Sequence, residues 1–289
     1  MAFRATVTVC LALFGLVVCG PAHAEKPKAG ASAGRPDVDR LKRTLESGAE
    51  ADQLAALDEL GNMSGPSAAL AAVPVNELLG RGASAGVLTR ALEVAGKLGQ
   101  ASSSAAVAPY ARHRTPEVRV TATRALARTG GPDAVAALRS ILHGEDRGSR
   151  GFAASGLGTL KAKEAVPDLF AVLAKDVPEA AGAIGELCAP ADCGKFSDLL
   201  GKFPFDLMQT GLSPILLRPE SEVPAEFKLA LLERLRKLQT DEARKFLAAV
   251  RASYPEKGNA WVKYGLDQAV DNKPVVPPPA DKGKGKAKP

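Results

Sequence analysis

The sequence predicts an all-α protein, a right-handed α-solenoid of about six antiparallel helical hairpins. Apolar residues recur at helical spacing, as Val118, Ala122 and Leu126 do, and no stretch alternates apolar and polar residues as a half-buried strand would. Residues 117–142 also match residues 148–173 when the two segments are aligned position by position, which indicates an internal repeat.

Each repeat reads as a helix, a short turn and a second helix. The first helix contains Ala and Gly where neighbouring helices must approach closely, the turn contains Gly, Pro, Asp or Lys, and the second helix carries large apolar residues. One such hairpin cannot bury its own apolar face, so hairpins stack and bury a continuous core. The predicted units are residues 52–78, 86–111, 117–142, 148–173, 178–203 and 225–250.

The segment PEVRVTATRALARTGGPDAVAALRSIL, residues 116–142, resembles the HEAT-like repeats, in particular the short variety found in the phycobilisome lyases. It has a Val-Arg opening, an Ala-x-x-Ala-Leu run, a Gly turn and an Ala-Val-x-x-Leu-x-x-x-Leu run. Pro116 and Glu117 stand where the family often has Asp. The resemblance covers about residues 50–250. It implies the solenoid fold but little about activity, because such repeats occur in scaffolds, regulators, transport factors and some enzymes.

The predicted solenoid domain spans residues 37–272, with two segments that break the repetition. Residues 204–224 form an insertion, read either as a packing adapter between repeats or as part of a binding face. Residues 257–271 form a C-terminal helix that caps the exposed end of the core. The flanking residues 25–36 and the Pro- and Lys-rich tail 273–289 are predicted to be disordered, because they contain too little apolar surface to fold.

The N-terminus predicts export. Residues 1–24 have a positive start, an uncharged apolar run and an AHA cleavage signal, which is typical of a secretory signal peptide cut after Ala24. We therefore expect a periplasmic or secreted protein with no transmembrane span. A second processing route is lipidation at Cys19, which would anchor the protein to the outer membrane, although Val18 replaces the small residue that usually precedes such a cysteine.

The charge of the chain is concentrated at its ends. The net charge is +6, but residues 37–272 alone carry −1, so we do not expect a nucleic-acid partner. Arginines are dense in residues 112–150. Equivalent positions line up in a solenoid, so the sequence predicts a basic stripe or, alternatively, a solvated outer face. The candidate binding residues are Arg112, Arg119, Arg124, Arg128 and Arg150.

Two cysteines remain after the expected cleavage, in the stretch GELCAPADCGKF at 185–196. Cys188 should end the first helix of the fifth unit and Cys193 should begin its second helix. A disulfide between them suits an oxidising compartment. A Cys-x-x-Cys redox motif has a different spacing, and zinc would need further ligands nearby.

We expect no catalysis, no metal site and no cofactor. HExxH and the phosphate loop do not occur in the sequence, and the two GASAG stretches, at 30–34 and 82–86, read as Gly-rich loops. His113 and His143 are predicted to end two successive second helices, where a histidine interacts well with the helix carbonyls. The favoured function is an exported scaffold that binds a protein or peptide in the bacterial envelope. The alternatives are a polyanion or membrane-surface binder and, from the resemblance alone, a bilin-lyase-like enzyme.

Overall fold

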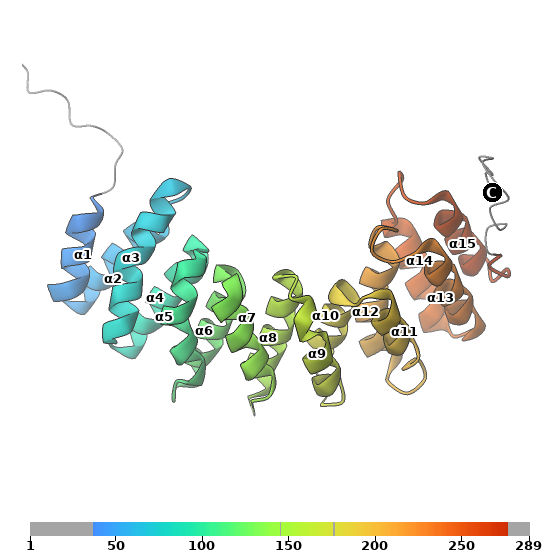
Figure 1. Ribbon diagram of the computed structural model, residues 1–289, viewed down its shortest axis with the longest axis horizontal. Coiled ribbons are helices and arrows are strands. Elements are labelled where there is room, and N and C mark those ends of the chain that lie inside the picture. Colours follow the sequence, from blue (N-terminus) through green and yellow to red (C-terminus); the bar gives the residue numbers. More distant parts are fainter. Residues whose placement is uncertain (1–36, 145, 176, 277–289) are drawn as a thin grey trace, which may run out of the picture. The chain divides into compact units, whose positions relative to one another are not determined.

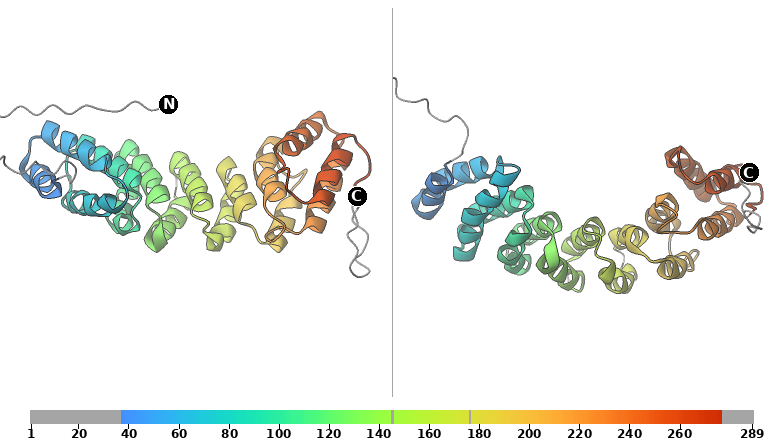
Figure 2. Two further views of the ribbon diagram at one scale, coloured as in Figure 1. Left: turned by 90° about the horizontal axis from the view of Figure 1, so that it is seen from above. Right: turned by 45° about the horizontal axis from the view of Figure 1, so that its top comes forward.

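The computed structural model describes residues 37–144, 146–175 and 177–276. Within these residues the chain forms fifteen α-helices and three short 3₁₀-helices, with no strand. The helices follow one another in chain order from α1 to α15 (Figures 1 and 2). The predicted all-α solenoid is therefore confirmed. The predicted signal peptide, Ala24, Cys19 and the linker 25–36 lie outside the described residues, as do residues 277–289.

Consecutive helices alternate between two layers. The even-numbered helices form one layer, in which each helix packs against the next. Its members are α2 (Glu50–Gly61), α4 (Ala85–Leu98), α6 (Pro116–Thr129), α8 (Arg147–Thr159), α10 (Pro178–Leu187), α12 (Phe205–Leu217) and α14 (Asp241–Ser253).

The odd-numbered helices form the second layer. They are α1 (Val38–Ser47), α3 (Pro66–Arg81), α5 (Ser104–Val107), α7 (Gly131–Leu142), α9 (Val166–Leu173), α11 (Pro190–Ser197), α13 (Ala225–Lys237) and α15 (Ala260–Val270). The 3₁₀-helices η1 (Ala101–Ser103) and η2 (Ala108–Arg112) flank α5, and η3 (Lys163–Ala165) precedes α9. The core lies between the two layers and consists of Leu, Val, Ile and Ala side chains.

Proline and glycine fix many of the helix ends. Pro occupies the first turn of several helices, among them α3, α6 and α10, where its missing N–H costs no helical hydrogen bond. Gly99 ends α4 in the left-handed conformation at φ 63°, and its N–H bonds the Ala95 carbonyl. Asp37, Ser84 and Asn259 cap the starts of α1, α4 and α15 through their side-chain oxygens.

Small residues let the even-numbered helices approach closely, as the sequence predicted. A methyl group on Gly156 of α8 would lie 2.7 Å from the Cβ of Ala127 on α6. On α10, a methyl group at Gly185 would collide with the backbone of Gly211 on α12. These contacts leave no space for larger side chains at either position, and α10 and α12 pack backbone against backbone.

The segment 204–224 contributes a full member of the even-numbered layer. Its helix α12 packs along α10, just as α10 packs along α8 and α8 packs along α6. On its other side α12 contacts α14. The segment is therefore better described as part of an additional repeat than as an insertion. Its sequence conceals this role because Pro214 lies inside the helix and the alanine-rich pattern of the other first helices is missing.

The C-terminal helix α15 packs against α13 and α14 and is the last helix of the row. The chain then returns along α13, where the Val275 N–H donates to Glu233 Oε2 at 3.0 Å and the Val275 side chain is buried. The first residues of the predicted tail thus belong to the folded structure. Among the described residues, no helix is long and apolar enough to cross a membrane.

Candidate functional site

A groove of about 930 Å³ separates η2 from α7 in the odd-numbered layer. Ala105, Ala108 and Pro109 line one wall, and Ala136 and Ala137 line the other. Pro109 has no N–H and interrupts the α-helical bonding of this repeat, so α5 continues only as the 3₁₀-helix η2. The groove is wide because small side chains face one another across it.

One end of the groove is basic. Arg112 reaches across it and donates from Nη2 to Ser140 Oγ at 2.8 Å. Arg114 follows in the loop after η2; its side chain is exposed and takes part in no ion pair within the described part of the chain. Tyr110 anchors η2 from behind, because its hydroxyl donates to the Leu79 carbonyl oxygen of α3.

The loop at the basic end is held by Arg119 and Asp146. Arg119 Nη1 donates to the carbonyl oxygens of His113 and Arg114 at 3.0 and 3.1 Å, and Arg119 Nε lies 3.7 Å from Asp146 Oδ2. Asp146 caps α8 by accepting from the Gly148 N–H at 3.2 Å, and it also accepts from Ser149 Oγ at 2.5 Å. The hydrogen bond from Ser149 lowers the pKa of Asp146, although partial burial opposes the shift. Both charged groups therefore support the loop.

The other end of the groove is acidic. Asp133 lies in the first turn of α7, where a carboxylate interacts favourably with the helix dipole. Its side chain is exposed, and no hydrogen bond or ion pair joins it to any residue that the structure describes. One acidic group and two basic groups thus lie at opposite ends of a groove with alanine-lined walls.

The predicted arginines do not form one surface. Arg112 and Arg119 line the groove, and Arg150 donates to the Gly144 carbonyl oxygen at 2.8 Å beside its basic end. Arg124 and Arg128 lie instead in a separate cleft of about 350 Å³ between α4 and α6. The turn of about 100° per residue explains this separation, since Arg119 and Arg128 point to opposite sides of α6.

The second cleft has its own charge pattern. Arg90 is engaged by Asp58 and Glu93, and Lys97 bonds Asn62 Oδ1 at 2.9 Å. The Arg124 guanidinium lies 4.1 Å from the centre of the Phe152 ring, a cation–π contact. Arg128 is exposed at its rim.

The two histidines occupy equivalent positions, as predicted. His113 follows η2 and His143 follows α7. His143 Nε2 lies 3.3 Å from Asp168 Oδ1, and Arg139 bonds the other oxygen of Asp168 at 2.6 Å. Burial raises the pKa of Asp168, but the hydrogen bonds from Arg139 and His143 outweigh it, so the pKa lies below its ordinary value.

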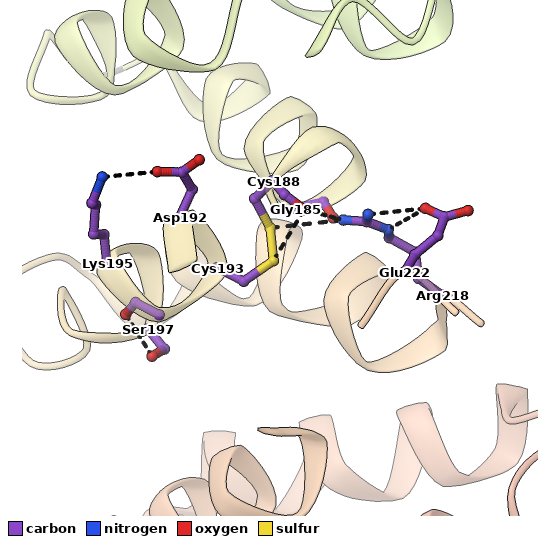
Figure 3. The surroundings of a disulfide bond; sticks show 9 residues. Gly185, Cys188, Asp192, Cys193, Lys195, Ser197, Arg218 and Glu222 are labelled. Carbon is purple, nitrogen blue, oxygen red and sulfur yellow. Dashed lines mark hydrogen bonds and ion pairs between the residues drawn. A yellow bond between two sulfur atoms is a disulfide. The ribbon is translucent and has the colours of Figure 1, made fainter. Parts of the chain in front are cut away.

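The predicted disulfide joins Cys188 and Cys193 across the turn between α10 and α11. Figure 3 shows that Arg218, which follows α12, points its guanidinium at this turn. Arg218 Nη1 donates to the carbonyl oxygens of Cys188 and Gly185 at 2.9 and 3.2 Å, and Glu222 pairs with the same guanidinium at 2.9 Å. Arg218 therefore fastens the bridged turn to the next repeat.

A buried polar cluster continues from Arg218 toward the C-terminus. Lys228 is fully buried, and its Nζ donates to the Arg218 carbonyl oxygen and to Glu220 Oε1. Tyr254 donates to the same Glu220 oxygen at 3.0 Å. Burial and the Glu220 carboxylate raise the pKa of Tyr254 to about 12. This cluster satisfies its own members and stabilises the packing of α13 and α14.

Sequence reasoning missed Asp133, Arg114 and the alanine walls as parts of a site. One signal was available, because a proline inside a helical pattern, here Pro109, marks an interrupted helix. The width of the groove depends on two helices from different repeats, which no local pattern reports.

A comparison with family models agrees with the observed helical repeats. A family model described as HEAT repeats matches residues 75–150 and 106–189, which include the groove. Among solved structures, the complex of CpcE and CpcF of phycocyanin lyase from Nostoc is similar at 15% identity, covering 85% of this chain and 98% of that chain, with a TM-score of 0.45. A designed armadillo repeat protein in complex with the peptide (KR)4 is similar at 16% identity, covering 76% and 100%, with a TM-score of 0.42. The curated proteins include no match.

Proposed function

We propose, from the premise that this chain carries HEAT repeats, that it is a scaffold that binds a protein or peptide segment without catalysis. The groove between η2 and α7 is the binding site in this proposal. Its volume of about 930 Å³ falls within the range of about 300–1,000 Å³ typical of ligand sites. The single observation that carries the proposal is this alanine-lined groove with charged groups at both ends.

The support for a binding groove is that its walls are apolar and its shape is fixed by other contacts. Arg119 and Asp146 hold the loop at one end, and Tyr110 holds η2 against α3. A site held in shape loses less conformational entropy on binding than one that must be ordered.

We also propose that the protein acts in the bacterial envelope, as a periplasmic or secreted protein. The support comes from the signal-like sequence of residues 1–24 and from the disulfide Cys188–Cys193, since disulfides persist in oxidising compartments. Intact-mass measurement of the protein from its native host tests this proposal. A mass that corresponds to cleavage after Ala24 supports export without an anchor, and one that includes acylated Cys19 supports the lipoprotein alternative.

Site-specific photocrosslinking tests the groove. A photoreactive residue at Ala105 should capture a partner in envelope extracts, and a synthetic copy of the captured segment should bind the purified protein. Ala136 is exposed in the groove wall, so Ala136→Trp should fill the groove and abolish that binding without unfolding the helix. Ala51→Trp, at an exposed position of α2 outside the groove, is the matched control. Equal binding by both variants would contradict the proposal.

A second candidate function is binding to an anionic surface through the cleft between α4 and α6. The observation that favours it is the exposed pair Arg124 and Arg128 on α6, beside Lys97. Vesicles that contain anionic lipid should bind the protein at low salt and release it at high salt. The double variant Arg124→Gln/Arg128→Gln should bind anionic vesicles no more tightly than it binds neutral vesicles. If the variant binds anionic vesicles as tightly as the parent protein does, this cleft is not the binding site.

A further inference from the structure

The charges at the two ends of the groove restrict what it can hold. Asp133 lies in the first turn of α7, and Arg112 contacts Ser140 near the end of the same helix. Since an α-helix rises 1.5 Å per residue, these ends lie roughly 10 Å apart along its axis. An extended peptide covers that distance in about three residues.

We infer that the groove selects a peptide segment with a basic residue at one end, an acidic group three or four residues away, and small apolar residues between them. This inference rests on the proposed function and specifies its partner. The basic residue would pair with Asp133, and the acidic group with Arg112 and Arg114.

The charged groups have free bonding capacity for such a partner. Asp133 is exposed and, among the residues described, bonds to no side chain. Arg112 uses one N–H on Ser140, and a guanidinium has five. Arg114 is exposed and its side chain has no partner in the described structure. A carboxylate can therefore be bound by two guanidinium groups at this end.

The alanine-lined walls of the groove select for small side chains in the partner. Ala105, Ala108 and Ala136 present single methyl groups, which leaves depth for side chains such as Ala or Val. The residues between the charged ends of the partner therefore enter a shallow apolar channel, where burial of their methyl groups adds affinity.

The same charge pattern disfavours a polyanion in this groove. A nucleic acid or an acidic glycan has negative charge along its whole length and would face Asp133 at one end. A peptide with opposite charges at its ends meets a complementary group at each end. Charge complementarity thus favours the peptide over the polyanion as the occupant.

The inference is tested with four capped pentapeptides, whose binding to the purified protein is measured by NMR titration. The peptides are Lys-Ala-Val-Ala-Glu and its counterparts with Lys at both ends, Glu at both ends or Gln at both ends. The Lys/Glu peptide should bind about 3- to 10-fold more tightly than each of the others, because two exposed ion pairs add to the apolar contact.

Reversal of one charge sharpens the test. Asp133→Arg should weaken the binding of the Lys/Glu peptide and strengthen the binding of the peptide with Glu at both ends. Glu117→Arg makes the same change of charge in the first turn of α6 outside the groove and should leave the order unchanged. The inference is overturned if the Lys/Glu peptide does not bind at millimolar concentration, if all four peptides bind equally, or if Asp133→Arg leaves their order unchanged.

The proposed function is judged separately by Ala136→Trp. If this variant blocks binding of the crosslinked partner, but neither the end charges of the peptides nor Asp133→Arg affects binding, the groove is the binding site and the inferred charge preference is wrong. If Ala136→Trp leaves partner binding intact, the proposed function fails together with the inference.

Discussion

The substitution Gly185→Ala should destabilise the protein, whereas Gly182→Ala in the same helix should stabilise it. Both glycines lie in the interior of α10, one turn apart. A methyl group at Gly182 would meet only the Thr210 carbonyl oxygen at 3.9 Å, an ordinary contact. A methyl group at Gly185 would lie 2.8 Å or less from three backbone atoms of Gly211. Backbone atoms cannot rotate away, so α12 would have to move.

The expected magnitudes follow from two opposing effects. Replacing Gly by Ala in a helix interior gains about 1 kcal/mol of helix propensity at either position. Overpacking costs about 1–3 kcal/mol, and contact with a fixed backbone places Gly185 at the upper end. Gly182→Ala should therefore add about 1 kcal/mol to the free energy of unfolding, and Gly185→Ala should remove about 2 kcal/mol.

Urea denaturation followed by circular dichroism measures both values. The pair tests more than a local contact, because it depends on α12 lying directly against α10. If residues 204–224 formed a surface insertion, both substitutions would add stability through helix propensity alone. A Gly185→Ala protein as stable as the parent would refute the described packing of α10 and α12.

Three further predictions concern stability. Reduction of Cys188–Cys193 should lower the free energy of unfolding by about 2 kcal/mol, from the chain entropy of the small loop, and a Cys188→Ala/Cys193→Ala variant should not respond to reductant in the same urea titration. Glu220→Ala should cost about 3 kcal/mol because it leaves buried Lys228 without its carboxylate, whereas Glu242→Ala, at an exposed position of α14, should change the urea midpoint little. Hydrogen bonding from Arg236 lowers the pKa of Glu233 from 4.5 to about 2. This carboxylate therefore contributes stability above about pH 4.5 that is lost as the pH falls toward 2, and Glu233→Gln should flatten that part of the stability profile; identical profiles would contradict it.

The fold could be predicted from the sequence because the residues that repeat are those that face the core. Ala122 and Leu126 are buried in α6, and their counterparts one repeat later, Ala153 and Leu157, are buried in α8. The Cys188–Cys193 bridge could be predicted because both cysteines lie at the same turn of one hairpin. The role of α12 could not, since its only recognisable repeat feature is Gly211, whose close partner Gly185 lies in another helix.

The site was harder to predict for a geometric reason. Density of arginine in the sequence does not determine which side of a helix each arginine faces, and α6 separates Arg119 from Arg124 and Arg128. Arg218 was overlooked because its contact with Cys188 joins residues 30 positions apart, with no pattern that links them.

The two layers differ in how much variation each tolerates, and this explains why the groove lies where it does. In the even-numbered layer, close contacts such as Gly156 with Ala127 and Gly185 with Gly211 fix the distance between successive helices. Each odd-numbered helix is attached to these helices by short turns, so its position is set by the rigid layer behind it. When α5 is interrupted at Pro109 and small residues line α7, the neighbouring helices do not close the gap, because close packing fixes the spacing of the layer behind them. If the groove is the binding site that we propose, it is formed before its partner arrives, and binding need not be accompanied by rearrangement of the solenoid.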